Sequence, residues 1–189
     1  MASLVYTAIT SLDGYVNDVS GNFDWAAPDD EVHAFVNELE RPIGTYIYGR
    51  RLYDVMKYWA TEDPEADRSA AMRDYRQIWQ AAHKVVFSAS LDAVSTPDTR
   101  LERAFDPAAV AELKAGSRTD ISIGGPTLAA AAFRAQLIDT VHLFLHPVAV
   151  GGGTPALPRD ARVDLELVDE RRFAGGVVHL HYRTRSADR

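Results

Sequence analysis

The chain has 189 residues, a net charge of −7 and no cysteine, and its 47% hydrophobic and 25% charged content predicts one globular domain over residues 1–189. The lack of cysteine excludes disulfides, thiolate zinc sites and cysteine nucleophiles, and the acidic balance argues against binding nucleic acid or an anionic membrane through a basic surface. Because neither a run of about 18 apolar residues nor a basic leader occurs, we expect a soluble cytoplasmic protein.

The first half of the chain alternates between strand-like and helix-like patterns. Residues 4–10 are rich in β-branched and apolar side chains, which indicates a strand. A proline and three acids at 28–31 open a helix, and apolar residues then recur at helical spacing. The other elements expected in this half are a strand at 45–49, helices at 50–56 and 66–82, and a strand at 83–88.

The second half begins with the same alternation and ends in strands. The expected elements are a short strand at 101–104, a helix at 107–115, a strand at 120–123, a helix at 126–137, and strands at 140–146, 163–172 and 177–183. Alternating elements imply a mostly parallel sheet with helices on both faces, and the last two strands form an antiparallel end. The predicted fold class is therefore α/β.

A glycine turn joins the strand at 120–123 to the helix at 126–137. Gly124 and Gly125 lack a Cβ and let a phosphate approach the backbone, and Pro126 fits the first helical turn. The free N–H groups of that turn and the helix dipole favour an anion. The same turn also occurs where a helix only packs closely on a sheet, so the motif alone leaves both interpretations open.

Two other strand ends carry phosphate-binding side chains. Arg50 and Arg51 open a helix at the end of the strand at 45–49, where guanidinium groups can bind phosphate, although they can equally be solvated. Ser88 and Ser90 lie at the end of the strand at 83–88, where their hydroxyls can bind phosphate. The alternative is that they cap the following turn, which serine commonly does and which we favour from the residues alone.

The remaining candidates for site residues are an acid that follows a tryptophan in the sequence and two pairs of histidines. Asp30, behind Trp25, either relays a proton in an apolar cleft or caps a helix. His142 and His146 share one strand face, and His179 and His181 alternate on the last strand. Because no further ligand has suitable spacing, we predict satisfied or surface histidines and no metal site.

Taken in order, these segments resemble the dihydrofolate reductase fold, and most closely its bacterial branch with the C-terminal reductase domain of the riboflavin-biosynthesis deaminase/reductase, RibD. Four motifs carry the resemblance, which covers residues 2–184: SLDGYV at 11–16, GRRLYD at 49–54, VFSASL at 86–91, and IGGPTL at 123–128 followed by the segment 137–155. The resemblance implies an NADPH-dependent reductase that transfers a hydride to a small heterocycle, such as a pterin or a riboflavin-precursor pyrimidine.

The resemblance also implies a set of cofactor-binding residues. They are Gly124, Gly125, Pro126, Thr127 and Leu128 after Ile123 at the pyrophosphate, Gly49, Arg50 and Arg51 at the adenosine-side phosphates, Ser88, Ala89 and Ser90 at the 2′-phosphate, and Ala8, Ile9 and Val16 at the nicotinamide. Many relatives have Arg or Lys where this chain has Ala89, so NADH and a deazaflavin remain alternative cofactors.

The segment Trp25 to Asp30 resembles the Trp-x-x-Pro-x-Asp segment of true dihydrofolate reductases, which implies that Asp30 is the proton-relaying acid. We expect the substrate in the cleft between the first helix and the 13–25 loop, with Asp13, Trp25 and His146 as substrate contacts. The strand at 140–146 and the antiparallel end leave a sheet edge that predicts a homodimer. The alternatives are a nucleotide-binding module without catalysis and a structural dimer with an empty cleft.

Overall fold

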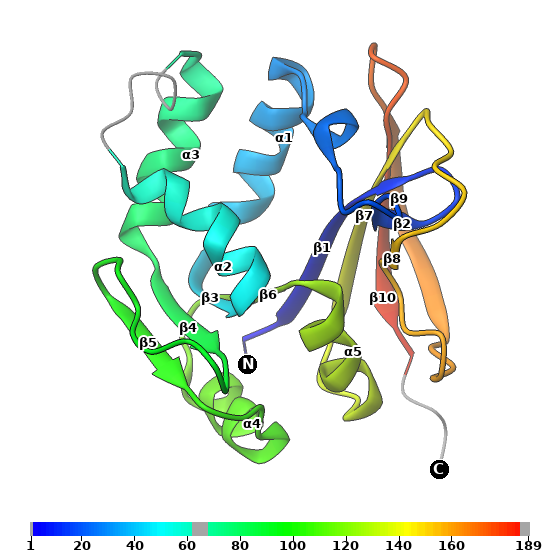
Figure 1. Cartoon of the computed structure of the whole chain (residues 1–189). Coiled ribbons are helices and arrows are strands. Elements are labelled where there is room, and N and C mark those ends of the chain that lie inside the picture. Colours follow the sequence, from blue (N-terminus) through cyan, green and yellow to red (C-terminus); the bar gives the residue numbers. More distant parts are fainter. Residues whose placement is uncertain (1, 62–67, 186–189) are drawn as a thin grey trace.

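One eight-stranded sheet runs through the molecule. The computed structural model describes residues 2–61 and 68–185. The strand order is β5-β4-β3-β6-β1-β7-β10-β9, in which β10 pairs antiparallel with β7 and β9 and the other neighbouring strands pair parallel (Figure 1). The strands are β1 Leu4–Ser11, β3 Ile43–Gly49, β4 His83–Phe87, β5 Thr99–Glu102, β6 Asp120–Gly124, β7 Thr140–His146, β9 Leu165–Arg172 and β10 Val178–Thr184. This arrangement confirms the predicted parallel sheet with an antiparallel end.

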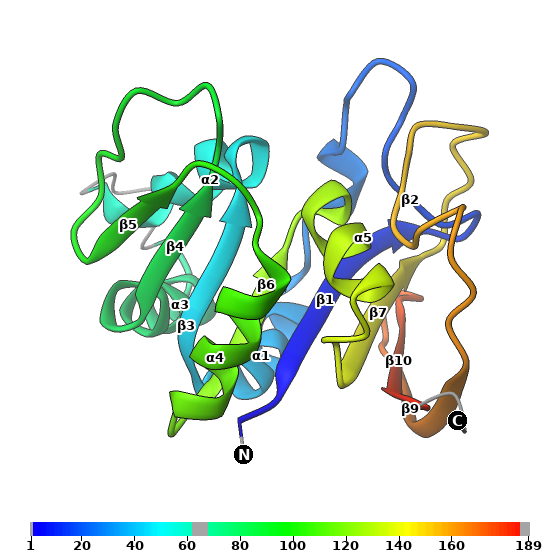
Figure 2. The same ribbon diagram turned by 90° about the horizontal axis from the view of Figure 1, so that it is seen from below.

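Helices cover both faces of the sheet, as predicted. Figure 2 shows α4 and α5 on one face and α1 and α3 on the other. The α-helices are α1 Asp30–Glu40, α2 Arg50–Met56, α3 Ala70–Ala81, α4 Pro107–Gly116 and α5 Pro126–Arg134. Two 3₁₀ turns, η1 Asp24–Ala26 and η2 Lys57–Ala60, precede α1 and follow α2. The expected start of α3 at residue 66 lies outside the described residues.

Three of the helices begin at a side-chain cap. Asp29, Ser69 and Asp106 accept hydrogen bonds from the backbone N–H groups at the starts of α1, α3 and α4. Each cap satisfies one of the amide groups that a helix leaves unpaired at its start. The helices α2 and α5 follow Gly49 and Gly125 and have no side-chain cap.

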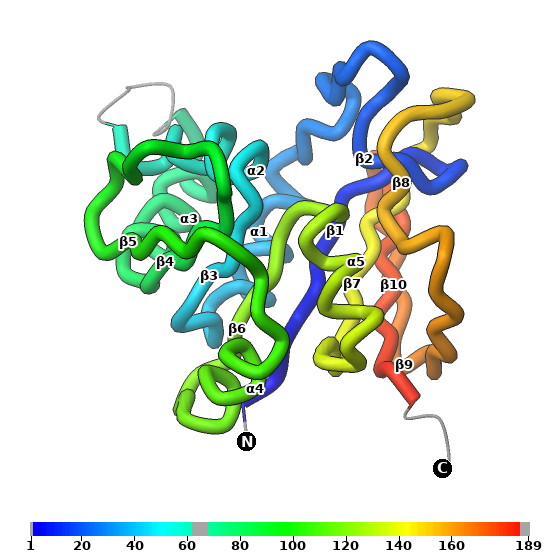
Figure 3. The backbone as a smooth tube through the Cα atoms, turned by 60° about the horizontal axis from the view of Figure 1, so that its bottom comes forward, coloured from blue at the N-terminus to red at the C-terminus, as the bar shows by residue number. Residues whose placement is uncertain are grey.

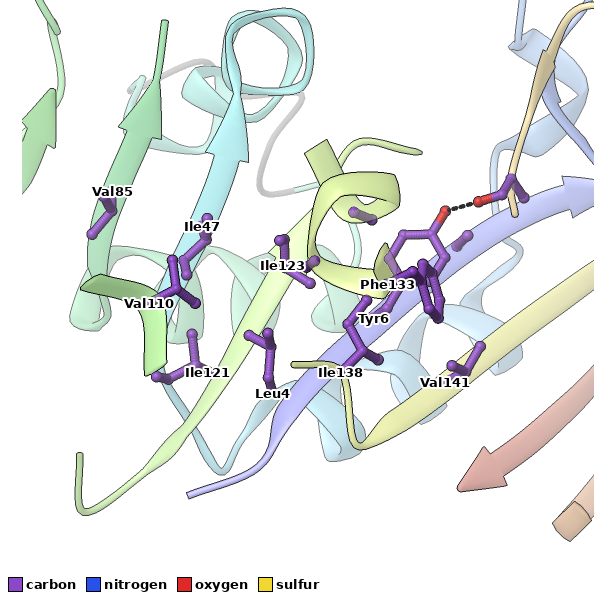
Figure 4. Close-up of a cluster of buried hydrophobic side chains, with 14 residues drawn as sticks. Leu4, Tyr6, Ile47, Val85, Val110, Ile121, Ile123, Phe133, Ile138 and Val141 are labelled. Atoms are coloured by element: carbon purple, nitrogen blue, oxygen red, sulfur yellow. Dashed lines mark hydrogen bonds between the residues drawn. The ribbon is translucent and has the colours of Figure 1, made fainter. Parts of the chain in front are cut away.

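Apolar clusters hold the helices on the sheet. On the α4 and α5 face, Leu4, Ile121 and Ile123 are fully buried with Phe133, and the Tyr6 hydroxyl donates a 2.6 Å hydrogen bond to the Ala156 carbonyl (Figure 4). On the other face, Trp79 of α3 is fully buried among tyrosines. A third cluster packs α1 against the last strands through Val32, Phe144, Phe173 and Val177.

The structure corrects three sequence predictions. The predicted strand 101–104 begins earlier, at Thr99, and the predicted helix 126–137 ends at Arg134. The strands β2 Tyr15–Asn17 and β8 Thr154–Pro155 were not predicted, because each has only two or three residues and shows no periodicity. The strand at 140–146 is not a sheet edge, because β7 lies between β1 and β10 and the edges are β5 and β9.

Candidate functional site

The carboxyl ends of the parallel strands bring the predicted motifs together. Tyr48 pairs with Gly124 across β3 and β6, and Gly49 pairs with Phe87 across β3 and β4. The turns that begin at Gly49, Ser88 and Gly125 are therefore neighbours in space, although up to about eighty residues separate them in the sequence. A Cβ built on Gly125 would lie 3.9 Å from the Gly49 backbone nitrogen.

The two glycines of the β6–α5 turn serve different purposes. A Cβ on Gly124 would overlap the Leu52 side chain and come within 3.2 Å of the Tyr48 ring, so Gly124 allows close packing of α2 on the sheet. Gly125 has φ +90, a backbone conformation that favours glycine, and a Cβ built on it would lie 3.7 Å from the Leu52 side chain. Because α5 has no side-chain cap, its first turn presents N–H groups without intrahelical partners. The turn therefore combines the packing role with a donor set that fits a phosphate.

Arg50 and Ser90 meet across the β3 and β4 turns. Arg50 Nη1 donates a 3.0 Å hydrogen bond to Ser90 Oγ, and its Nε lies 3.8 Å from Asp54. Ser88 is buried, and its Oγ accepts hydrogen bonds from the N–H groups of Ser90 and Leu91, which confirms the turn-capping interpretation of Ser88. Ala89, Ser90, Arg50 and Arg51 are all exposed at this edge.

A third arginine lies at the turn after β4, and the sequence patterns did not predict it. Arg103, which follows β5, donates hydrogen bonds to the carbonyls of Leu91 at 2.5 Å and Asp92 at 3.4 Å. No local pattern signals this placement, because it depends on the pairing of β5 with β4.

The residues that the resemblance assigns to the nicotinamide occupy β1 and β2. Ala8 is buried against the α5 face, whereas Ile9 packs with the cluster under α1. Val16 lies in β2 and packs on the same cluster as Ala8. Ala8 and Ile9 thus lie on β1, which pairs with β6, the strand that leads into the α5 turn.

Trp25 and His146 come together at a cavity of about 230 Å³ beyond the end of β7. Their ring centroids are 6.1 Å apart in an edge-on arrangement. His146 is 6% exposed, and its Nε2 and the Trp25 Nε1 are both buried without a hydrogen-bond partner. The remaining cavity residues are Ala27, Asp29, Pro147, Val148, Gly175 and Val177.

Burial lowers the pKa of His146, while the Trp25 main chain and the Asp29 charge act in the opposite direction. Neutral imidazole is therefore favoured in this cavity, beside two groups that stabilise a bound proton. A buried nitrogen without a partner is costly unless a ligand or water satisfies it.

The cavity is lined by Asp29 and not by Asp30. Asp29 Oδ1 accepts a 2.9 Å hydrogen bond from the Val32 N–H, and its Oδ2 would lie 2.7 Å from a Cβ on Gly175. Asp30 is an exposed residue in the first turn of α1, and its charge acts on His33. The spacing of the reductase motif matched Asp30, but the start of α1 directs the side chain of Asp29 toward β7 and the β9–β10 turn.

Asp13 does not line this cavity. It forms hydrogen bonds that hold the loop before β8. Its carboxylate accepts hydrogen bonds from the N–H groups of Val150 at 3.1 Å and Gly151 at 2.7 Å. The Ser11 side chain, and after it these two backbone bonds, lower the pKa of Asp13. Figure 3 shows the loop between β2 and α1 and the loop between β7 and β8 projecting from the same edge of the molecule.

His142, His179 and His181 lie against one another, and the first two are buried whereas His181 is partly exposed. His142 Nδ1 and His179 Nε2 are 2.9 Å apart, and the His142 and His181 ring centroids are separated by 4.4 Å. The predicted satisfied state is confirmed for His142 and for the Nε2 of His179, whose Nδ1 has no partner.

Comparisons with known proteins agree with this geometry. Residues 2–179 match the model of the RibD C-terminal domain. The uncharacterized protein YyaP of Bacillus subtilis (strain 168) is 28% identical over 193 residues, which cover 95% of this chain and 93% of that protein.

Two solved structures share the fold. A putative riboflavin biosynthesis protein from Shewanella sp. PV-4 superposes with a TM-score of 0.75 at 20% identity, covering 98% of this chain and 100% of its own. The diaminohydroxyphosphoribosylaminopyrimidine deaminase/5-amino-6-(5-phosphoribosylamino)uracil reductase of Thermotoga maritima superposes with a TM-score of 0.65 at 14% identity, covering 97% of this chain and 57% of that one. No helix among the described residues is long and apolar enough to cross a membrane. The chain belongs to the RibD C-terminal domain family and has its dihydrofolate reductase-like fold.

Proposed function

We propose that this protein is a reductase that uses NADPH to reduce a small heterocycle, such as a pterin or a pyrimidine related to riboflavin synthesis. Membership of the RibD C-terminal domain family supports an oxidoreductase activity. The observation that carries the proposal is that the glycine-led starts of α2 and α5, which have no side-chain cap, meet at the carboxyl ends of the parallel strands, where the Trp25–His146 cavity also lies.

The residues at the carboxyl ends of these strands fit a dinucleotide. The first turn of α5 would hold the pyrophosphate, and Arg50 with Ser90 would hold an adenosine-side phosphate. When bound, the dihydronicotinamide supplies a hydride to an electrophilic ring carbon, and the adjacent ring nitrogen takes a proton. NADH and a deazaflavin are the alternative cofactors, since Ala89 replaces a basic residue.

Thr127→Glu tests the pyrophosphate site without disturbing the fold. Thr127 is exposed in the first turn of α5, where a carboxylate stabilises the helix but repels a phosphate. We expect at least a tenfold loss of NADPH affinity in a tryptophan-fluorescence titration, with no loss of thermal stability. Ala109→Glu, at the equivalent exposed turn of α4, is the matched control and should bind NADPH like the wild type. Equal NADPH affinity in all three proteins would contradict the pyrophosphate assignment.

We further propose that Asp29 performs the proton-relaying role that the resemblance gives to Asp30. Asparagine caps helices about as well as aspartate, so Asp29→Asn keeps α1 intact while removing the charge in the cavity. We expect a loss of turnover of about 10²-fold or more in Asp29→Asn, the size typical of a lost proton donor or acceptor. Asp30→Asn should change turnover little, and the opposite ranking would return the role to Asp30.

A further inference from the structure

We propose that Glu31 is a positioning residue, which holds the β9–β10 turn against the start of α1 and thereby keeps the Asp29 carboxylate in place beside His146. Glu31 belongs to the first turn of α1, two residues after Asp29, and the turn that it holds comprises residues 173–177. The consequence for catalysis rests on the proposed function, in which Asp29 relays the proton. The hold on the turn itself requires neither cofactor nor substrate.

The two carboxylate oxygens of Glu31 contact the hairpin at different points. Oε2 accepts a 3.0 Å hydrogen bond from the Ala174 backbone N–H, and Oε1 lies 3.5 Å from Arg171 Nη2. The ion pair with Arg171 joins two half-exposed side chains, so it contributes little by itself. The bond from the Ala174 N–H is charge-assisted and therefore stronger than a bond between neutral groups. We assign the hold on the turn mainly to this bond.

The turn is closed by its own backbone, so an attachment at one residue places the others. The Phe173 N–H donates a 2.9 Å hydrogen bond to the Val177 carbonyl, and the Gly176 N–H donates a 3.1 Å bond to the Phe173 carbonyl. Ala174 and Gly175 lie between these bonded residues. A bond at the Ala174 N–H therefore also determines where Gly175 lies.

The hairpin needs such an attachment because β9 is an edge strand. Its neighbour in the sheet is β10 alone, and every residue of β9 after Leu165 is exposed. Phe173 packs against Phe35 beneath the turn, with ring centroids 5.3 Å apart. Apolar contact is not directional, so this packing does not set the direction in which Gly175 faces. The directional contact with α1 is the bond to Glu31.

Gly175 connects the turn to Asp29. A Cβ built on Gly175 would lie 2.7 Å from Asp29 Oδ2, while Asp29 Oδ1 accepts a 2.9 Å hydrogen bond from the Val32 N–H. The carboxylate is thus held by α1 on one oxygen and confined by the turn on the other. Burial lowers the pKa of His146, and the charge of Asp29 acts in the opposite direction. The pKa of His146 therefore reports where the Asp29 carboxylate lies.

The experiment follows the ring C–H signals of His146 by NMR as the pH is changed, without any ligand. The variant His146→Gln assigns these signals by their loss. In Glu31→Ala we expect the pKa of His146 to fall by roughly half or more of the fall that Asp29→Asn causes, because the carboxylate can then turn toward solvent. In the Asp29→Asn background, Glu31→Ala should cause no further fall. The Ala174 amide should exchange about tenfold faster or more in Glu31→Ala.

Two matched variants separate the bond from the charge. Glu31→Gln removes the charge but keeps an amide oxygen that can accept the Ala174 N–H, so the pKa of His146 should stay close to that of the wild type. Asp30→Ala removes an acid from the same helix turn, whose charge acts on His33, and should also leave the pKa of His146 unchanged. Both Glu31 and Asp30 are exposed, so these substitutions keep the fold.

Three results would overturn the inference. They are an equal fall of the His146 pKa in Glu31→Ala and Glu31→Gln, an unchanged His146 pKa in Glu31→Ala, and a further fall when Glu31→Ala is added to Asp29→Asn. The proposed function fails separately. If NADPH does not bind the wild type, or if Asp29→Asn keeps full turnover, while the His146 titrations are as expected, Glu31 still positions Asp29 and only the reductase assignment or the proton-relaying role is lost.

Discussion

At the scale of single residues, Glu40 makes the stability of the fold depend on pH. Glu40 is 5% exposed beside Tyr46 and Thr7, and burial raises its pKa to about 7, although those two hydroxyl groups act in the opposite direction. The folded state therefore keeps a proton that the unfolded chain releases near pH 4.5. Because the unfolded chain binds fewer protons in this range, the free energy of unfolding falls as pH rises from about 4.5 to about 7. We predict that the free energy of unfolding of the wild type falls by about 3 kcal/mol between pH 4.5 and 7.5 and that Glu40→Gln abolishes this fall, measured by urea unfolding. An unchanged pH slope in the variant would contradict the assignment.

The stacked histidines act in the opposite direction. Burial, with repulsion from His181 next, lowers the pKa of His142 to about 3 and that of His179 to about 4. Both stay neutral in the fold while the unfolded chain gains protons below about pH 6.5, so stability is lost as pH falls from there. We predict that His142→Gln reduces the stability difference between pH 7 and pH 5 by about 2 kcal/mol. An unchanged stability difference between pH 7 and pH 5 in His142→Gln would contradict this assignment.

At the scale of elements, the short β2–β8 pair depends on one glycine. Gly153 has φ +137, and a Cβ there would overlap the Asn17 carbonyl oxygen, whereas Gly151 has φ +75 and open space around it. Alanine at Gly151 would strain the backbone by about 1–2 kcal/mol. Alanine at Gly153 would add the collision with the Asn17 carbonyl to its own backbone strain. We predict that Gly153→Ala lowers the free energy of unfolding clearly more than Gly151→Ala. Equal losses would show that β2 and β8 separate at little cost.

At the scale of the whole molecule, the free strand β9 is the surface on which we predict a homodimer. It forms one sheet edge over eight residues, and Leu167 and Val168 are 50% and 44% exposed on it. An exposed edge strand with apolar side chains pairs readily with another chain. We predict that the wild type has twice the monomer mass by light scattering and that Leu167→Lys with Val168→Lys yields monomers. Val19→Lys, on the 82% exposed Val19 of a distant loop, is the control, and a monomeric wild type would refute the dimer.

The sequence by itself determined the alternation of elements, the antiparallel end and the glycine-led start of α5, because periodicity, turn residues and caps act within a few residues. It also indicated Trp25 and His146, which the structure brings to one cavity. Only the tertiary structure decided that Asp29 and not Asp30 lines that cavity, because one residue along a helix start rotates a side chain by about 100°. The edge position of β9, the Arg103 contacts at the Leu91 turn and the Gly175 contact with Asp29 likewise depend on strand order, which joins residues that no local pattern connects.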